Sequence, residues 1–196
     1  MKIVLASTSP FRKSLLEKLC IPFTTANPKV DETPLPSESA PQLVERLAMA
    51  KAKAVAEELQ QGWVIGSDQV AVIDHCILGK PKTHDNAIAQ LRQCSSNKVT
   101  FYTGLCLYNA ATNTSQSLVD TFSVHFKELS DYQIERYLLS EQPYNCAGSF
   151  KSEGLGIALF ERLEGKDPNT LVGLPLIDLI ALFKQQGIDI FDYIQQ

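Results

Sequence analysis

The 196-residue sequence contains no hydrophobic run that approaches the roughly 18 apolar residues of a membrane-spanning helix. Its apolar start, Met1–Ala6, gives way to hydroxyl residues at Ser7 and is shorter than the roughly 7–15 apolar residues of a secretory signal. Internal repeats and low-complexity tracts are also missing. We therefore expect a cytoplasmic protein that does not act at a membrane.

A surplus of positive charge is missing as well. The chain has 18 Lys and Arg residues against 22 Asp and Glu residues, which gives a net charge of −4. Proteins that coat nucleic acids usually carry a basic surplus or stripe, so this balance argues against a nucleic-acid partner. A local basic pocket for a small anion remains compatible with it.

The patterns of a disulfide framework or a zinc site are absent. The five cysteines are an odd number without a Cys-x-x-Cys pair, and the three histidines contain no His-x-x-x-His pair. Adjacent His75 and Cys76 leave a redox or metal-binding module as an alternative, but a hairpin turn explains them more simply.

The residues that are present suit a folded protein. Hydrophobic residues make up 44% of the chain and charged residues 20%, which excludes intrinsic disorder. The length predicts a single domain over residues 1–196, at most one with two lobes.

Apolar periodicity and capping signals divide the chain into alternating strands and helices. Strands are expected at residues 2–6, 23–26 and 63–73, with a short return strand within 74–78, a hairpin of 99–108 and 118–127, and a glycine-rich, strand-like segment at 148–160. Helices are expected at residues 10–19, 41–60, 83–94 and 130–140, and from Pro175 to Gly187. This alternation predicts an α/β fold with a mixed sheet.

The first candidate site is the turn between the expected first strand and first helix. Three hydroxyl residues, beginning at Ser7, turn the chain, and Ser9-Pro10 has the order of an N-cap and a first helical residue. The free N–H groups of a helix start attract anions. Arg12 falls in the first turn, where a cation disfavours the helix, so a phosphate ligand would explain it. The alternative is an ordinary N-cap with Arg12 in solvent.

The second candidate is Lys51, in a long helix that Ser39 and Gln42 begin with capping-box spacing. Lys51 lies four residues after Leu47 and four before Val55, on the apolar stripe of that helix. A lysine there needs a partner because burial of an unpaired charge is costly, and phosphate oxygens are suitable. The alternative is a lysine that follows the edge of the stripe into water.

The third candidate is Asp68, in the middle of an expected strand. Aspartate is a poor strand former and an unpaired buried carboxylate is costly, so Asp68 requires a cation, a metal ion or hydrogen-bond donors. Gln69 faces the other side of a regular strand. Both side chains line one pocket only if Gly66 permits a bulge or the strand ends there. The alternative is a structural carboxylate that caps a neighbouring loop.

Three shorter motifs add groups of the same kind. Lys80 lies between Gly79 and Pro81, and the proline favours an extended lysine suited to a phosphate contact. Asp31-Glu32 could hold a hard cation, although such pairs are more often solvated. The segment 149–154 has flanking glycines that allow close backbone approach, although an ordinary turn also explains them. Together these groups suit phosphoryl chemistry assisted by Mg²⁺ or Mn²⁺.

Motifs in order along nearly the whole chain resemble the Maf family of nucleoside triphosphate pyrophosphatases. They are Leu5-Ala6-Ser7-Thr8-Ser9-Pro10-x-Arg12, Val30-Asp31-Glu32, Ala50-Lys51-Ala52, Gly66-Ser67-Asp68-Gln69 and Gly79-Lys80-Pro81. Two further segments, Cys146 to Gly154 and Phe160 to Thr170, are similar to the subfamily that acts on 7-methyl-GTP. Family members that prefer dTTP or UTP lack the Ser-Phe-Lys-Ser-Glu-Gly string found here at 149–154.

The resemblance implies an elongated α/β fold of two lobes around a mixed sheet, similar to inosine triphosphatases, with a central nucleotide cleft. It implies hydrolysis between the α- and β-phosphates, a divalent cation and a homodimer. Asp68 would be the catalytic carboxylate and would bind the metal together with Glu32. The phosphates would be held by Ser7, Arg12, Lys51 and Lys80, and base preference would be set by Phe11, Gln69 and Glu153.

The chain departs from the family pattern at Phe11 and Lys13, where we expect Trp and Arg. Phenylalanine keeps an aromatic face of smaller area, which bears on base selection. N7-methylation gives guanine a positive charge, so an aromatic face and the carboxylate of Glu153 both suit this base. Our hypothesis is that Phe11 stacks and Glu153 discriminates, in a house-cleaning enzyme that removes modified nucleotides.

Two other functions would use the same residues. One is a Maf-type pyrophosphatase for dTTP, UTP or CTP, and the 149–154 string argues against it. The other is a regulator of cell division that senses a nucleotide by binding it, without hydrolysing it. The presence of Asp68, Lys80 and Glu32 argues against a sensor, because sensing does not need a water-activating carboxylate.

Overall fold

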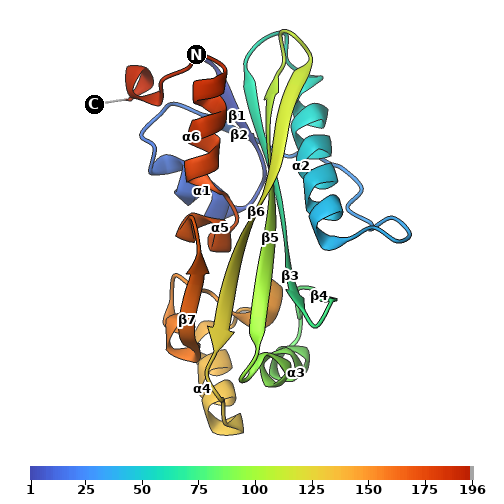
Figure 1. Cartoon of the computed structure of the whole chain (residues 1–196), viewed down its shortest axis with the longest axis vertical. Helices are drawn as coiled ribbons and strands as arrows, with labels where there is room; N and C mark the ends of the chain where they lie inside the picture. The colour runs from blue at the N-terminus through green and yellow to red at the C-terminus, as the bar shows by residue number, and fades with distance from the viewer. Residues whose placement is uncertain (195–196) are drawn as a thin grey trace. The chain divides into compact units, whose positions relative to one another are not determined.

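The computed structural model describes residues 1–194 as a mixed α/β fold (Figure 1). Its strands are β1 (Ile3–Ala6), β2 (Thr24–Ala26), β3 (Trp63–Ile73), β4 (Cys76–Leu78), β5 (Lys98–Asn109), β6 (Thr114–Phe126) and β7 (Phe160–Gly165). Its α-helices are α1 (Pro10–Glu17), α2 (Ala40–Ala56), α3 (His84–Cys94), α4 (Asp131–Glu141), α5 (Pro168–Val172) and α6 (Leu176–Gln185). Short 3₁₀ helices are η1 (Ala147–Ser149), η2 (Leu155–Leu159) and η3 (Ile190–Tyr193). Within this range, every helix is too short or too polar to cross a bilayer.

The strands form one mixed sheet in the order β2-β1-β3-β5-β6-β7, and β4 pairs with β3 off this path. β1 is parallel to both neighbours, with Ile3 opposite Trp63 and Val4 opposite Thr24. β4 is antiparallel to β3, and β7 is antiparallel to β6. This mixture of directions confirms the sheet type predicted from the sequence.

Contacts divide the described chain into two compact units. Among the described residues, unit 1 comprises 1–69, 103–120 and 167–194, and unit 2 comprises 70–102 and 121–166. The long strands β3, β5 and β6 contribute residues to both units.

Unit 1 buries both faces of its part of the sheet. The alternation of β1 sends Ile3 and Leu5 to the face covered by α1 and α6, and Val4 and Ala6 to the face covered by α2 (Figure 1). Because helices cover both faces, β1 is apolar throughout its length.

Aromatic rings form the centre of unit 2. Phe150 lies edge-to-face against Phe101, Phe126 and Phe160, with ring centroids between 4.9 and 5.4 Å apart. α3 and α4 also pack against each other in this unit. The core therefore fixes the segment around Phe150, which continues toward Glu153.

Most of the expected elements are present near the expected residues. β3 has the predicted bounds, and the predicted capping box begins α2, with Gln42 Oε1 accepting the Ser39 N–H at 3.0 Å. α2 ends at Ala56, earlier than expected. Asp74 and His75 have positive φ values in the tight turn between β3 and β4, which confirms the hairpin turn expected there.

The prediction of a strand-like segment at 148–160 is wrong. η1 and η2 occupy most of this segment, and β7 begins only at Phe160. Gly148 and Ser149 have φ of +74° and +62°, which interrupts an extended chain. A Cβ on Gly156 would lie 2.2 Å from the carbonyl oxygen of Lys151, so the chain folds back on itself there. The glycines therefore serve turns and close approach.

Candidate active site

Helix α1 begins at the turn predicted to bind an anion. The Ser9 side chain accepts the Arg12 N–H at 3.4 Å, and the buried Ser7 hydroxyl accepts the Ser9 N–H at 3.1 Å. Pro10 takes the first helical position, where a missing N–H is harmless. The predicted N-cap is confirmed, and two hydroxyls lie at a helix start whose dipole favours an anion.

Arg12 is half-buried, so the alternative that placed it in solvent is wrong. Its Nε donates at 2.9 Å to the carbonyl oxygen of Gly173, which also accepts the Ser67 hydroxyl at 2.9 Å. Burial lowers the pKa of the Arg12 guanidinium, and the charges of Asp68 and Glu32 partly offset this effect. The guanidinium stays charged at neutral pH because its ordinary pKa is so high. Arg12 therefore belongs to the same charged cluster as the two carboxylates.

Lys51 is buried, as the apolar stripe of α2 predicts, with 5% of its surface exposed. Its ammonium lies 2.6 Å from Asp68 Oδ1 and 2.6 Å from Glu32 Oε1. Two carboxylates thus stand where the sequence suggested phosphate oxygens as partners. The Asp68 side chain is 11% exposed and that of Glu32 is 61% exposed, so the cluster has a buried side and a solvent side.

Two glycines allow α2 to approach the sheet closely enough for this contact. A Cβ on Gly66 would lie 2.1 Å from the carbonyl oxygen of Ala48, and one on Gly104 would lie 2.1 Å from that of Val44. Any larger residue at these positions would push the helix away from the strands. Gly66 therefore serves helix packing, and β3 continues through Asp68 without ending there.

The adjacent carboxylates Asp31 and Glu32 have different partners. Asp31 Oδ1 accepts the N–H and the hydroxyl of Thr33, at 2.9 and 2.6 Å, and so shapes the turn. Glu32 reaches Lys51. The structure therefore selects one carboxylate of the pair for the charged cluster.

The loop that carries Glu32 is fixed to α2 by a bidentate ion pair. The Glu38 carboxylate accepts hydrogen bonds from Nε and from a terminal nitrogen of Arg46, at 2.6 and 2.8 Å. Arg46 also donates to the carbonyl oxygen of Thr33 at 3.2 Å. The bonds from Arg46 lower the pKa of Glu38 from 4.5 to about 2. This contact holds the loop in the conformation that brings Glu32 to Lys51.

We expect Glu38→Gln to loosen the Glu32 loop, because the variant loses the charge-assisted bonds to Arg46. In the wild-type protein the contact should also weaken in acid. Since folding lowers the pKa of Glu38, the contact contributes fully above about pH 4.5 and is lost as the pH falls toward about 2. Hydrogen exchange of the amides in 29–38, corrected for the intrinsic pH dependence of exchange, measures both effects.

The matched control is Glu57→Gln, which removes an exposed i,i+4 ion pair at the end of the same helix. It should leave exchange in 29–38 unchanged. Equal exchange in the two variants would show that the Glu38 contact does not hold the loop.

Gln69 is held through its amino group. Nε2 donates to the Thr103 hydroxyl at 2.9 Å and to the carbonyl oxygens of Thr170 and Leu171 at 2.7 and 3.3 Å. Thr103 donates its own hydroxyl hydrogen to Thr170, so its oxygen is left to accept. These acceptors fix the orientation of the amide, and Oε1 lies beside Gly173, 3.7 Å from where a Cβ on that glycine would stand. Asp68 and Gln69 contact different groups, as neighbours on a regular strand should.

In unit 2, Lys80 lies on a loop held from α3. Gln90 Nε2 donates to the carbonyl oxygen of Gly79 at 3.0 Å, and Asn86 Nδ2 donates to that of Pro81 at 3.0 Å. Lys80 itself is exposed, whereas Pro81 is buried. The backbone on both sides of Lys80 is therefore fixed, which suits a lysine that binds an anion as a point charge.

The segment that carries Glu153 is held against the end of α4. Glu141 Oε1 accepts the Leu155 N–H at 2.7 Å, and the Glu141 carbonyl oxygen accepts Lys151 Nζ at 2.7 Å. A Cβ on Gly154 would lie 2.6 Å from Glu141 Oε1, so a larger residue there would displace the Glu141 carboxylate. Glu153 is exposed between these anchored positions.

In unit 2, the charges of Lys80 and Glu153 both influence the Cys146 thiol. Burial raises the pKa of this thiol, Lys80 lowers it and Glu153 raises it further. Burial also raises the pKa values of Cys94 and Cys106 to about 12. These three thiols are protonated and inert at neutral pH. The redox alternative concerned His75 and Cys76 instead, and Cys76 is exposed at the start of β4.

Glu32 and Asp68 are the residues that could hold a metal ion. Mg²⁺ commonly takes one or two carboxylates from the protein and its other ligands from phosphate and water, and Mn²⁺ accepts the same oxygen ligands. Two carboxylates that meet on one ammonium fit this donor set. Among residues 1–194, no cluster of three or more His, Cys, Asp or Glu side chains could form a metal site. The arrangement therefore suits a metal that arrives with a phosphate group.

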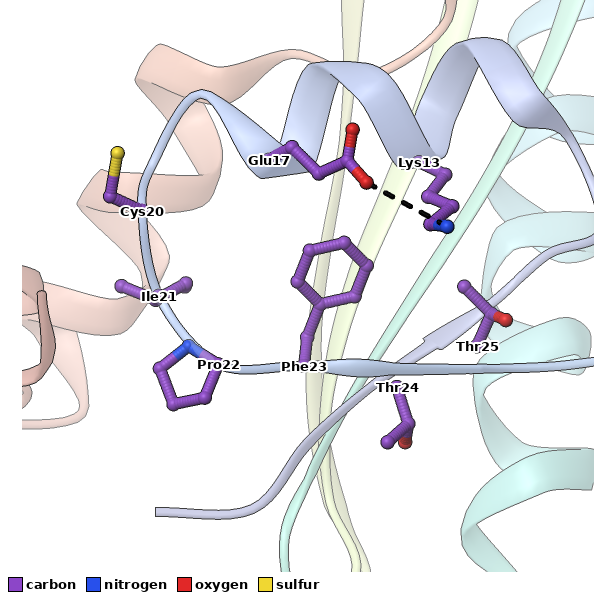
Figure 2. A pocket seen from close by; sticks show the side chains of 8 residues that line it. All are labelled: Lys13, Glu17, Cys20, Ile21, Pro22, Phe23, Thr24 and Thr25. Carbon is purple, nitrogen blue, oxygen red and sulfur yellow. Dashed lines mark ion pairs between the residues drawn. The ribbon is translucent and has the colours of Figure 1, made fainter. Parts of the chain in front are cut away.

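A separate depression of about 850 Å³ lies on unit 1 beside α1 and β2 (Figure 2). The Phe23 ring points toward α1, where Lys13 and Glu17 form an i,i+4 ion pair at 3.7 Å. The depression is lined by Lys13, Glu17 and residues 20–25. It therefore includes neither the cluster around Lys51 nor the turn at Ser7–Arg12.

Two parts of the site were missed by sequence reasoning. Gly173 has φ of +115° and turns its carbonyl oxygen toward Arg12 and Ser67. A glycine followed by Leu-Pro is typical of the end of a helix, so the turn at Gly173 could have been predicted from the sequence. Glu38 and Arg46 pair from a loop to a helix, and their separation matches no helical or strand spacing.

Comparison with known proteins agrees with the motifs. A family model described as "Maf-like protein" matches residues 2–186. Relatives named 7-methyl-GTP pyrophosphatase in Colwellia psychrerythraea, Pseudoalteromonas atlantica and Vibrio vulnificus are 60%, 58% and 61% identical to this chain. The alignments cover 96%, 100% and 96% of this chain, and 94%, 100% and 97% of the respective relatives.

A likeness to a solved structure concerns the fold alone. The Staphylococcus aureus Ham1 protein is 14% identical to this chain with a TM-score of 0.52, and the match covers 96% of this chain and 100% of that one. This supports the mixed α/β fold expected from the sequence.

Proposed function

This chain belongs to the Maf family, and from that premise we propose that it is a nucleoside triphosphate pyrophosphatase. The observation that carries the proposal is the cluster in which Lys51 lies 2.6 Å from both Asp68 and Glu32. It joins a buried carboxylate, an exposed carboxylate and a cation beside the guanidinium of Arg12. The substrate that we propose is 7-methyl-GTP, the nucleotide named in relatives that are 58–61% identical.

The reaction is hydrolysis of the α–β phosphoanhydride. The oxygen of a water molecule bonds to the α-phosphorus while the bond from that phosphorus to the bridging oxygen breaks, and the electron pair leaves with pyrophosphate. Asp68 accepts a hydrogen bond from the water, orients it and takes up its proton. The products are 7-methyl-GMP and pyrophosphate.

The charged residues stabilise the phosphates and the leaving group. In unit 1, Ser7, Arg12 and Lys51 would contact phosphate oxygens, and in unit 2 Lys80 would do so. Positive charge fixed at these positions favours the negative charge that develops on pyrophosphate. A Mg²⁺ or Mn²⁺ ion held by Glu32 and Asp68 would neutralise phosphate charge and lower the pKa of a bound water.

Base recognition is assigned to three residues. Phe11 is 37% exposed at the start of α1 and offers an aromatic face to a cationic base. Gln69 has an amide oxygen that can accept a hydrogen bond, which would match the N–H donors of guanine. Glu153 supplies a negative charge that favours 7-methylguanine over guanine.

The family resemblance also leads us to propose a homodimer that acts in the cytoplasm. Light scattering coupled to size-exclusion chromatography measures the oligomeric state directly, and a single-chain mass would contradict the dimer.

The experiment that tests the function is a pyrophosphate-release assay with Mg²⁺ or Mn²⁺ and a panel of 7-methyl-GTP, GTP, dTTP, UTP, CTP and ITP. Selective release from 7-methyl-GTP is the expected result. Activity centred on UTP or dTTP would overturn the assigned base but keep the reaction. Nucleotide binding without release from any member of the panel would favour the sensing alternative.

Glu153→Gln should reduce the preference for 7-methyl-GTP over GTP by about tenfold, the effect of about 1.4 kcal/mol. The variant keeps the shape of the side chain but loses the charge that attracts a cationic base. Turnover of the poorer substrate GTP should change much less. Glu161→Gln, at an exposed position of β7, is the control and should keep the wild-type ratio. Equal losses on both nucleotides would contradict the discriminating role of Glu153.

A further inference from the structure

One side chain of α3 joins the two segments of unit 2 that carry Lys80 and Glu153. Gln90 Nε2 donates to the carbonyl oxygen of Gly79 at 3.0 Å, directly before Lys80. Gln90 Oε1 accepts the hydroxyl of Ser149 at 2.5 Å, in the segment that leads to Glu153. Both ends of a single amide are therefore in use, one on each segment.

The partners fix which way the amide lies. A carbonyl oxygen only accepts, so Gly79 must face the amino end of Gln90, and the oxygen end is then left for the Ser149 hydroxyl. Ser149 is fully buried, and its hydroxyl is directed toward Gln90 by this hydrogen bond. A carboxylate would keep the contact to Ser149 and lose the contact to Gly79.

We infer that Gln90 is a positioning residue that couples the Lys80 loop to the Glu153 segment. The inference rests on the proposed function, in which Lys80 binds phosphate and Glu153 recognises the base. A substrate held at both ends requires a defined spacing between these groups. Gln90 sets that spacing within unit 2, and the burial of Ser149 makes the connection stiff.

Each segment also has anchors that do not involve Gln90, so its loss should leave the protein folded. Asn86 holds the Pro81 carbonyl oxygen, and the Lys82 N–H bonds to the carbonyl oxygen of Tyr144 at 2.9 Å. Glu141 holds the other segment through Leu155. What Gln90 adds is a direct side-chain connection from Gly79, next to Lys80, to Ser149, which the Lys82–Tyr144 bond does not provide.

The test uses Gln90→Glu, Gln90→Met and Ser149→Ala in the intact protein, with Gln93→Ala as control. Gln93 is exposed on the same helix. Steady-state kinetics with 7-methyl-GTP and GTP are paired with hydrogen exchange of the 79–82 and 149–154 amides. Exchange is measured without nucleotide, so it reports the coupling even if the substrate is misassigned.

Gln90→Met should raise KM for 7-methyl-GTP by about tenfold, the value of one hydrogen-bonded anchor, while kcat changes less than KM. Gln90→Glu should have a similar effect, because its carboxylate faces the Gly79 carbonyl oxygen. Ser149→Ala should raise exchange at 79–82, a segment that Ser149 reaches through Gln90. The double variant Gln90→Met/Ser149→Ala should then be no worse than the more severe single variant.

Two results would overturn the inference. One is a Ser149→Ala variant whose 79–82 amides exchange as in the wild type, and the other is additive KM effects in the double variant. A wild-type protein that releases no pyrophosphate from any nucleotide would instead count against the proposed function, and the exchange result would still decide the coupling. A Gln93→Ala variant that matched Gln90→Met would be a third result against the inference, because it would show that the change in KM does not depend on the two hydrogen bonds of Gln90.

Discussion

Asp68→Asn should lower kcat for pyrophosphate release by about a thousandfold, within the 10²–10⁴ that a positioned acid or base usually contributes. Asparagine fills the same space but cannot take a proton from water. Its side-chain oxygen can still accept from Lys51, which also keeps Glu32 at 2.6 Å, so the fold should remain intact. Nucleotide affinity should be kept or improved, because a negative charge near the phosphates is removed. Calorimetric titration separates this retained binding from the lost turnover.

Asp31→Asn is the matched control for the aspartate substitution. Asp31 precedes Glu32 in the same loop but bonds to Thr33, and asparagine keeps an acceptor for that contact. Its turnover should remain within about twofold of the wild type, as expected for a surface change that keeps its hydrogen bonds. A near-normal rate in Asp68→Asn would remove Asp68 from the catalytic role. Equal losses in both variants would point to the loop conformation as the cause.

Lys51 and Asp68 show how far the sequence predicts the site. Periodicity placed Lys51 on the inner face of α2, and the poor strand propensity of aspartate marked Asp68 as a residue that needs a partner. Both predictions concern one element at a time, and the structure confirms both burials. That the two residues pair with each other depends on how closely α2 approaches β3. Gly66 controls that approach, and its role in packing is not visible in local spacing.

The same reasoning explains where the sequence misled. The segment 148–160 has alternating apolar residues and glycines, which predict an extended chain. Its conformation is set instead by the positive φ of Gly148 and by the hydrogen bond from the Leu155 N–H to the Glu141 carboxylate. Similarly, Gln69 offered no sequence signal for its orientation, which depends on carbonyl oxygens about a hundred residues further along. Long-range polar contacts of this kind produce no periodic pattern in the sequence.

Lys51→Met should destabilise the protein by about 3 kcal/mol, the low end of the range for removing one partner of a buried ion pair. Methionine fills the volume of the lysine stem but leaves Asp68 buried without its cation and facing Glu32. The exposure of the Glu32 side chain, 61%, keeps the cost from being larger. For a chain of this size, about 3 kcal/mol corresponds to a fall in Tm of about 6–12 °C. Thermal and urea unfolding monitored by circular dichroism measure it.

A double-variant cycle distinguishes the pairing from lost packing. In Lys51→Met/Asp68→Asn the uncompensated buried carboxylate is gone, so the free energy of unfolding should recover by about 1–2 kcal/mol relative to Lys51→Met. Lys53→Met is the control on the outer face of α2, where the ammonium lies 3.8 Å from Glu57 and both side chains are 63% exposed. Its effect should stay within about 0.5 kcal/mol. If Lys51→Met were as stable as Lys53→Met, the ammonium would not compensate Asp68, and the cluster would lose its place as the centre of the active site.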